Sequence, residues 1–381
     1  MSYANDFDSV ALLEQMLRIP SLSGQEGDLA RFLVAEMRQL GFESYVDGAG
    51  NAVGEIGAGP AIVLLGHIDT VPGLVPVRIE PEGAGTSSGG AGAATAPLLY
   101  GRGAVDAKGP FAAFVAAVAR LAGGHGEPGG RREPPLRCRL VLVGAVEEEA
   151  ASSKGAHYVV DRYAPVACVI GEPSGWDRLT LGYKGRLLAE GRWEQPMAHS
   201  AGRTVAVAER AVAFWNAVQA HCAAHNQGKA LLFDQLLPSL RAIQSGSDGL
   251  ADWAELTIGL RLPPAVQPDA LAADLAAYAG GGSIQFRGGC LAYRGDKNNL
   301  LVRAFLKGVR AAGGTPGFLL KTGTSDMNVV GPAWRCPILA YGPGDSNLDH
   351  TPDEHIAIEE YLRAIDVLEV ALRELQKALG A

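Results

Sequence analysis

Residues 61–72 read AIVLLGHIDTVP, an apolar run that ends abruptly in a histidine and an aspartate. Two later segments share this pattern, RLVLVGAV at 139–146 and VACVIGE at 166–172. Nearly continuous runs rich in Val, Ile and Leu are typical of strands buried on both faces of a mostly parallel sheet. A helical pattern, FAAFVAAVARLA at 111–122, lies between them, so the first part of the chain is predicted to be α/β.

The pattern changes after about residue 180 and returns near residue 295. The middle stretch predicts two helices at 204–225 and 268–278 and two strands at 254–263 and 283–288. We therefore expect a larger α/β domain at 1–180 and 295–381, interrupted by a smaller α+β domain at 181–294. The ends of the larger domain are predicted to be helical, over 7–41 with Asp8 or Ser9 as first cap, and over 354–379.

Composition excludes several classes of partner. The chain has 381 residues, 48% of them hydrophobic, and a formal net charge of -8. No dense block of Lys and Arg is present, so nucleic acid is not an expected partner. The apolar runs are too short to span a bilayer, and residues 1–17 lack a secretory leader pattern. Five scattered cysteines without CxxC spacing predict reduced thiols and a cytoplasmic location.

Residues able to bind metal follow nearly every long apolar run. They are His67 and Asp69 after the first run, Asp106 before the helix, Glu147, Glu148 and Glu149, then Glu172, and His350. Taken singly, each has an ordinary explanation as a helix cap or a solvated face. Together they gather where the carboxyl ends of parallel strands form a binding site. The sequence therefore predicts a metal centre at this edge of the sheet.

The types of ligand indicate which metal and which reaction. Imidazoles and carboxylates without a nearby thiolate favour Zn²⁺, with Co²⁺ or Mn²⁺ as substitutes. Two such ions bridged by a carboxylate activate water near neutral pH and polarise a carbonyl group. A spare carboxylate must then accept a proton and pass it to the leaving group. Neighbouring glutamates can divide these duties, one as ligand and one as base.

Four motifs in this order resemble the dinuclear zinc aminoacylase family. They are GHIDTVP at 66–72, YGRGAVDAKGP at 100–110, the glutamate cluster, and GEPSG at 171–175. That family includes acetylornithine deacetylase, succinyl-diaminopimelate desuccinylase and carboxypeptidase-G-type enzymes. The resemblance covers essentially the whole chain and implies a catalytic domain with an inserted lid and dimerisation domain.

The resemblance also implies a role for each ligand. His67 and Glu172 are expected to be terminal ligands of one ion, and His350 and one glutamate of the cluster are expected to bind the second. Asp106 is expected to bridge both ions. Asp69 is expected to orient the His67 ring.

Two further details come from the same resemblance. The peptide bond between Asp106 and Ala107 is a candidate for the cis form. The family pattern makes Glu148 the base and Glu149 the ligand, whereas a shift by one residue makes Glu147 the base and Glu148 the ligand. We adopt the first register as the prediction.

The inserted domain contains MAHSAGR, residues 197–203, which resembles a segment that reaches the active site of a partner subunit. The resemblance implies that His199 stabilises the oxyanion across a homodimer. Without it, a histidine near a turn would be interpreted as a surface residue.

Further motifs, including VEEEAASSKGA, DKNNL and KTGTSDMNVV, resemble the branch of the family that releases lysine or ornithine from an amino-group carrier protein. In that branch the amino acid is attached through its α-amino group to the C-terminal glutamate of the carrier. The candidates for binding the product or the carrier are Lys184, Arg261, Lys297, Lys321, Thr322, Gly323, Asp326 and Asn328. Asp326 is expected to face the side-chain amine of the product.

Three alternatives remain open at this point. A deacetylase of N-acetyl-lysine or N-acetylornithine would use the same metals, and so would a dipeptidase. A non-catalytic member of the fold would lack some ligands, whereas all the expected types are present here. A serine or thiol hydrolase is disfavoured, because the sequence has no Gly-x-Ser-x-Gly elbow and no cysteine in a nucleophile setting.

Overall fold

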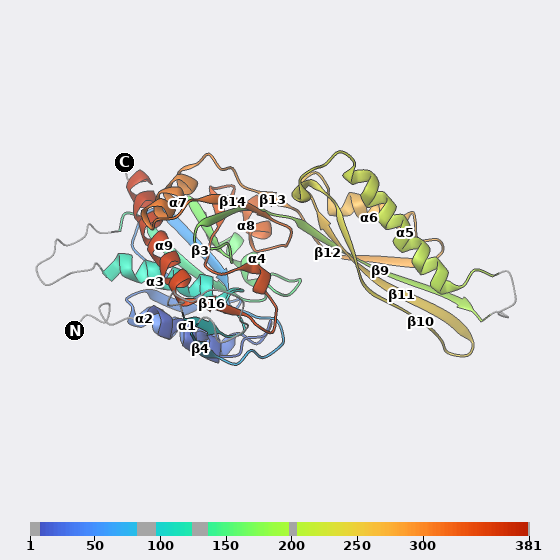
Figure 1. The fold of residues 1–381 in the computed structure, drawn as a ribbon, viewed down its shortest axis with the longest axis horizontal. Coiled ribbons are helices and arrows are strands. Elements are labelled where there is room, and N and C mark those ends of the chain that lie inside the picture. The colour runs from blue at the N-terminus through green and yellow to red at the C-terminus, as the bar shows by residue number, and fades with distance from the viewer. Residues whose placement is uncertain (1–7, 82–96, 124–135, 198–203, 380–381) are drawn as a thin grey trace, which may run out of the picture. The chain divides into compact units, whose positions relative to one another are not determined.

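The computed structural model describes residues 8–81, 97–123, 136–197 and 204–379, which form two compact units (Figure 1). Unit 1 contains Met1–Leu181, Gly295–Leu319 and Ser325–Ala381, and unit 2 contains Gly182–Arg294 and Leu320–Thr324. The short return of residues 320–324 to unit 2 has no counterpart in the expected division. Two Gly-rich segments, residues 81–97 and 123–135, fall almost wholly outside the described residues.

Unit 1 is built on a mixed sheet. In spatial order its strands are β1 (Glu43–Val46), β2 (Ala52–Ile56), β6 (Arg139–Ala145), β3 (Ala61–His67), β7 (Ala167–Gly171), β15 (Ile338–Ala340) and β8 (Arg178–Tyr183). The pairs β6–β3, β3–β7 and β7–β15 are parallel, and the pairs at both edges are antiparallel. This arrangement confirms the predicted mostly parallel sheet. Every residue of β3 is buried, as its continuous apolar run predicts.

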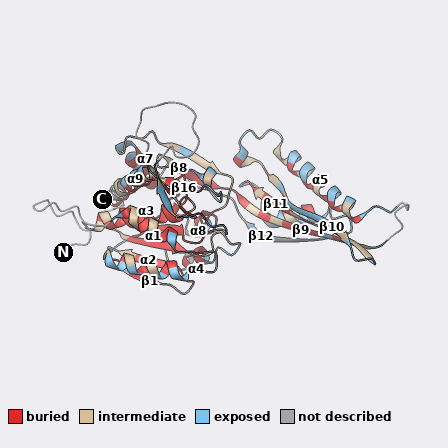
Figure 2. Ribbon diagram, turned by 60° about the horizontal axis from the view of Figure 1, so that its bottom comes forward, coloured by how far each residue is buried: buried red, intermediate tan, exposed pale blue. Residues whose placement is uncertain are grey.

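Helices cover the sheet of unit 1 (Figure 2). They are α1 (Ser9–Arg18), α2 (Gly27–Gln39), α3 (Lys108–Gly123), α4 (Lys154–Val160), α7 (Leu300–Ala311), α8 (Met327–Trp334) and α9 (Ile358–Leu379). Asp8 caps α1, because its Oδ1 accepts hydrogen bonds from the amides of Val10 and Ala11. The most buried helix is α3, which packs between the sheet and helices α1 and α9.

Three glycines let α3 lie close to the carboxyl ends of the central strands. Gly66, Gly144 and Gly171 stand at the same level of β3, β6 and β7. A Cβ atom on Gly66 or Gly144 would lie 3.3 or 3.2 Å from the ring of Phe111. On Gly171 it would lie 2.9 Å from the ring of Phe114. Larger residues would therefore push the helix away from the strand ends that carry the candidate ligands.

A second, small sheet in unit 1 corrects one prediction. It is antiparallel, with the order β16 (His355–Ala357), β5 (Leu98–Tyr100) and β4 (Arg78–Glu80). The C-terminal helix was expected to begin at residue 354, but α9 begins at Ile358. Residues 355–357 pair instead with a strand some 250 positions earlier, a long-range contact that helical spacing cannot reveal.

Unit 2 is an antiparallel sheet with helices on one face (Figure 1). Its strands are ordered β10 (Leu237–Ser247), β11 (Ala251–Leu262), β9 (Gly185–Pro196) and β12 (Ser283–Cys290), and its helices are α5 (Val207–Asn226) and α6 (Pro268–Ala276). Residues from both helices and from the sheet share one core, in which the rings of Trp193 and Phe214 lie 5.5 Å apart. The remaining described strands, β13 (Tyr293–Arg294) and β14 (Gly317–Lys321), do not belong to this sheet, and each pairs with β8.

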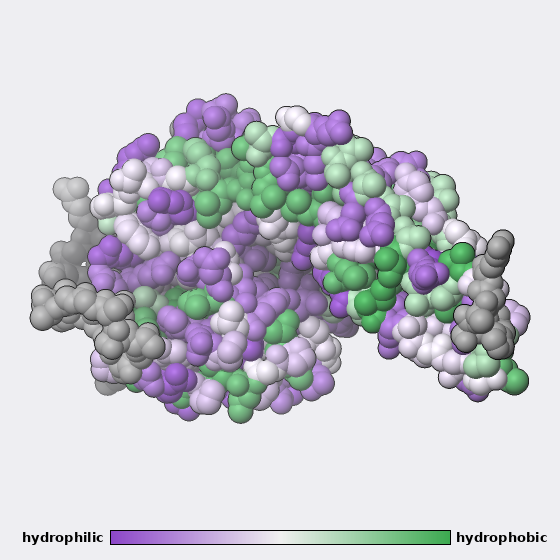
Figure 3. Space-filling view, turned by 45° about the vertical axis from the view of Figure 1, so that its right-hand side comes forward, coloured by the Kyte–Doolittle hydropathy of each residue, from purple (hydrophilic) through white to green (hydrophobic). Residues whose placement is uncertain are grey.

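None of the described helices combines the length and the apolar character that crossing a membrane would require. On the face drawn in Figure 3, hydrophilic residues cover much of the surface, and hydrophobic residues gather in patches between them.

Candidate metal centre

The candidate ligands of unit 1 emerge from neighbouring strands. His67 is the last residue of β3, Glu172 directly follows β7, and Glu148 and Glu149 lie in the loop after β6. The register pairs His67 with Ala145 of β6 and places the last residue of β7 beside the residue before His67. Because these three strands are parallel, their loops leave the sheet at the same edge.

Asp106 joins two histidines that are distant in sequence. It stands in the loop before α3, and its Oδ1 lies 3.0 Å from Nε2 of His67. Its Oδ2 lies 3.0 Å from Nε2 of His350, which also lies 2.8 Å from Oε1 of Glu149. One carboxylate therefore presents each of its oxygens to a different imidazole. The peptide bond that follows, between Asp106 and Ala107, is cis, as the family resemblance implied.

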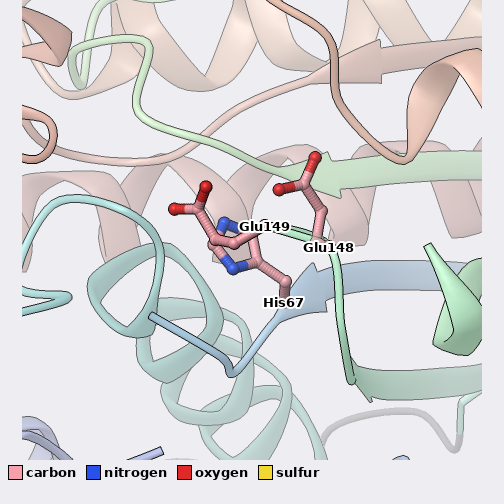
Figure 4. A group of neighbouring side chains, drawn as sticks. All are labelled: His67, Glu148 and Glu149. Carbon is pink, nitrogen blue, oxygen red and sulfur yellow. The ribbon is translucent and has the colours of Figure 1, made fainter. Parts of the chain in front are cut away.

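The ligand atoms form overlapping groups. His67, Asp106 and Glu172 make one group, and Asp106, Glu149 and His350 make another, each with its ligand atoms within 4.8 Å of one another. Asp106 is common to both, which is the arrangement that a bridging carboxylate requires. A third group joins His67 with Glu148 and Glu149, and Figure 4 shows the two glutamate side chains extending from one loop on either side of the His67 ring.

Several carboxylates surround two imidazoles in this cluster, and burial and hydrogen bonds shift their pKa values. Burial raises the pKa of Glu148 well above its ordinary value and also raises that of Glu149. Burial opposes ionisation of Asp106 as well, but the hydrogen bonds from His350 and His67 outweigh it and hold its pKa far below the usual range. The hydrogen bond to Asp106 raises the pKa of His350 to about 10.

These donors fit a pair of divalent cations. Two imidazoles and several carboxylates, with no thiolate among them, are the ligand types of catalytic zinc sites. Two cations would offset the negative charge of the clustered carboxylates, which adds to the effect of burial on the pKa of Glu148. The residues present are therefore compatible with a dinuclear centre in both number and chemistry.

Asp69 lies against the His67 ring and also binds the glutamate loop. Nδ1 of His67 lies 3.1 Å from the backbone carbonyl oxygen of Asp69 and 3.4 Å from its Oδ1, and the carboxylate is fully buried. The same carboxylate accepts hydrogen bonds from the amides of Glu148 and Glu149, both at 3.1 Å, and from the hydroxyl of Ser23 at 2.7 Å. One buried residue, through its carbonyl and its carboxylate, thus contacts the histidine and the backbone of both glutamates.

Two further residues that sequence reasoning missed hold the start of the same loop. The amide of Val146 donates to Asn51 Oδ1 at 3.0 Å, and the amide of Glu147 donates to Glu26 Oε1 at 3.1 Å. Together with the two amides that donate to Asp69, the backbone N–H groups of four consecutive residues, 146–149, donate to side-chain oxygens. No local pattern marks Asn51 or Glu26, because each acts on a segment about 100 positions away.

Glu147 points to a different environment from its two neighbours. Its Oε2 accepts a hydrogen bond from Ser152 at 2.7 Å, and its Oε1 lies 3.4 Å from Nζ of Lys154. Its backbone has a φ of 58°, a left-handed conformation that turns the chain at this residue. It belongs to none of the candidate ligand groups among the described residues, whereas Glu148 and Glu149 both do.

Two of the predicted substrate residues lie in unit 1, and one of them, Asp326, is near enough to the cluster for its charge to act on Glu148. Asp326 is 2% exposed, and its Oδ1 has no hydrogen-bond partner among the described residues. Burial raises its pKa to about 7, and the charge of His67 opposes that shift. Asn328 is also buried, and its Oδ1 accepts the amide of Ser325 at 2.9 Å. Lys297, by contrast, is exposed in the loop before α7.

The other predicted substrate residues belong to unit 2. Lys184 is fully buried and donates to the carbonyls of Leu232, Phe233 and Gln235. Its amine therefore stabilises backbone inside unit 2. Arg261 donates to Thr324 Oγ1 at 3.3 Å. The segment Leu320–Thr324, which belongs to unit 2, contains three partly buried candidates: Lys321, Thr322 and Gly323. His199 lies outside the described residues.

Comparisons with known proteins agree with the geometry. The model of peptidase family M20/M25/M40 matches residues 63–374. A relative from Deinococcus radiodurans named [LysW]-lysine hydrolase is 46% identical over 373 residues, covering 96% of each chain. A relative from Sulfurisphaera tokodaii named [LysW]-lysine/[LysW]-ornithine hydrolase is 27% identical and covers 96% of this chain and 94% of its own.

Solved structures share the fold. An M20 family metallo-carboxypeptidase from Sulfolobus solfataricus has a TM-score of 0.75 at 18% identity, covering 97% of this chain and all of its own. A dinuclear metal binding peptidase from Bacillus subtilis has a TM-score of 0.65 at 14% identity, covering 96% of this chain and 97% of its own.

Proposed function

This chain belongs to the peptidase family M20/M25/M40, and from that premise we propose that it releases lysine, or ornithine, from an amino-group carrier protein. The bond cleaved is the amide between the α-amino group of the amino acid and the C-terminal glutamate of the carrier. The choice of substrate is supported mainly by the near full-length match to the Deinococcus relative, whose name specifies carrier-linked lysine. The chain itself is a metal-dependent hydrolase of the amide-cleaving type.

The proposed metal ligands are the two overlapping groups of unit 1. His67 and Glu172 would hold one ion, Glu149 and His350 the other, and Asp106 would bridge them. The donor types favour zinc, with cobalt as a substitute. When bound, the ions would promote ionisation of a water molecule and polarise the scissile carbonyl group.

Glu148 is the proposed proton carrier. Its carboxylate is not needed as a ligand in either bridged group, and it lies beside His67 and Glu149. Burial raises its pKa, which makes the carboxylate a better base than an exposed glutamate. Glu148 takes the proton of the attacking water and then gives it to the departing α-amine. The hydrogen bond that its backbone amide donates to Asp69 Oδ1 keeps the backbone in place during both transfers.

Two parts of the proposal rest on the family resemblance alone. His199 of a partner subunit would stabilise the oxyanion, and the chain would act as a homodimer. A cytoplasmic location completes the proposal.

The substrate is tested by parallel release assays. Carrier-linked lysine, carrier-linked ornithine, the two N-acetyl amino acids and a γ-glutamyl dipeptide are incubated with chelated enzyme, with and without added zinc or cobalt. We expect metal-dependent release with a strong preference for the carrier-linked substrates. Equal or faster turnover of the acetyl compounds would replace the carrier proposal with a deacetylase, and preference for the dipeptide would replace it with a dipeptidase.

Asp326 provides a test of specificity within that function. We propose that its buried carboxylate pairs with the side-chain ammonium of lysine or ornithine, since an unpaired buried anion is destabilising. Asp326→Asn should lower kcat/KM for carrier-linked lysine by about 10- to 100-fold, the loss expected for one hydrogen bond to a charged group. Carrier-linked norleucine, which lacks the ammonium, should react at an unchanged rate.

The control is Asp353→Asn, which alters an exposed aspartate of the same unit and should affect neither substrate. An equal decrease for lysine and norleucine in Asp326→Asn would assign the residue to folding or to the metal centre and would remove it from substrate recognition.

A further inference from the structure

Glu354 is a fully buried carboxylate whose place is set by the small sheet of unit 1. It directly precedes β16, and β16 pairs with β5 so that His355 faces Tyr100. This register places Glu354 opposite Gly101, the first residue after β5, and the amide of Gly101 donates to the Glu354 carbonyl at 3.2 Å. The loop that begins there ends on the candidate bridging ligand.

The Glu354 side chain binds that loop at several points. Its Oε1 accepts the amides of Gly103 and Val105, both at 3.0 Å, and of Asp106 at 3.2 Å. Its Oε2 lies 2.7 Å from Nη1 of Arg102, which itself is largely buried. The residues between β5 and Asp106 have no helix or strand of their own, so this carboxylate supplies the hydrogen bonds that regular structure would otherwise provide.

The same segment of chain carries a second candidate ligand. His350 lies four residues before Glu354, and its Nε2 contacts both Asp106 and Glu149. One short stretch therefore supplies a ligand of one ion and the anchor of the carboxylate that serves both. A displacement of Glu354 would move Asp106 relative to His67 on one side and to His350 on the other.

We propose that Glu354 is a positioning residue for the dinuclear centre: it fixes the Asp106 backbone so that the two carboxylate oxygens meet both ligand groups at once. This inference rests on the proposed metal site. It predicts that loss of Glu354 weakens binding at both ion positions together, because the shared ligand is displaced. A purely structural role predicts lower thermal stability with unchanged metal affinity.

The experiment compares three variants of the full-length chain. Glu354→Ala removes the anchor, and Glu354→Gln keeps an acceptor oxygen but loses the ion pair with Arg102. Glu360→Gln is the matched control, because Oε1 of Glu360 also accepts two backbone amides, from Trp176 at 3.2 Å and Gly344 at 3.0 Å, that do not belong to ligand residues. Zinc affinity and stoichiometry are measured by calorimetry after chelation, cobalt coordination by visible absorption, and stability by thermal melting.

We expect Glu354→Ala to bind zinc about 10- to 100-fold more weakly at both positions, the range found for residues that support metal ligands. Its cobalt spectrum should differ from that of the wild type. The zinc affinity of Glu354→Gln should lie between those of the wild type and Glu354→Ala. If the alanine variant does not fold, the glutamine variant provides the test of the positioning role. Glu360→Gln should keep wild-type affinity and spectrum whatever its melting temperature.

Two outcomes separate this inference from the proposed function. Wild-type zinc affinity and cobalt spectrum in Glu354→Gln, together with a lower melting temperature, would overturn the positioning role and leave the metal site intact. Absence of metal binding in the wild-type chain would instead overturn the proposed function, and the inference about Glu354 with it.

Discussion

Glu148→Gln is expected to lower kcat by about 10²- to 10⁴-fold, the contribution typical of a general acid–base catalyst. The amide of glutamine cannot accept the proton of water, yet it preserves the size of the side chain. The four amide contacts that hold residues 146–149 use backbone groups of the loop, so they survive the substitution. Metal stoichiometry, measured by calorimetry, should stay at two ions, because Glu148 is outside both bridged groups.

Glu147→Gln is the matched control for this prediction. Glu147 is one residue away, has the same side chain, and binds Ser152 and Lys154 instead of the cluster. Its kcat should stay close to that of the wild type. The opposite pattern, a large loss in Glu147→Gln and a lost ion in Glu148→Gln, would shift the register of base and ligand by one residue and contradict the proposed assignment.

The fold could be predicted where strands are buried on both faces, because their sequences are then continuous apolar runs. β3, β6 and β7 are buried on both faces, and their apolar runs gave nearly correct boundaries. The unit 2 strands β9 and β10 were missed for the opposite reason. β9 alternates buried and partly exposed residues, and β10 is an edge strand that is mostly exposed, so neither reads as a distinct apolar run.

The candidate site divides in a similar way. Ligand types could be predicted because histidine and carboxylates follow strand ends, where a parallel sheet gathers them. The supporting residues could not. Glu26, Asn51 and Glu354 each bind backbone amides of a segment distant in sequence, and a backbone amide carries no residue identity that a pattern could match. Lys184 is a further example, because no local pattern indicates that its amine donates to the carbonyls of Leu232 and Phe233, and its role in substrate binding stays a prediction.

Asp106→Asn should have an effect on activity at least as large as that of Glu148→Gln. The amide retains one coordinating oxygen but loses the negative charge and the ability to bridge, so the proposed pair of ions loses its shared ligand. We expect calorimetry to detect at most one weakly bound zinc ion and hydrolysis to fall to background. Asp345→Asn, in an exposed loop of the same unit, is the control and should bind two ions with wild-type affinity.

The metal-free variant offers a second measurement that does not depend on activity. In the metal-free chain, Asp106 is the main reason why the pKa of His350 rises to about 10, above its ordinary value. A histidine whose pKa is raised on folding stabilises the protein fully below its unfolded pKa, and this contribution is lost as pH rises through the folded value. In Asp106→Asn the pKa of His350, followed by NMR after chelation, should fall toward its ordinary value, and the decrease in stability between about pH 6.5 and pH 10 should shrink. An unchanged His350 titration would mean that Glu149 alone holds the imidazole, and Asp106 could then not be the carboxylate shared by both ligand groups.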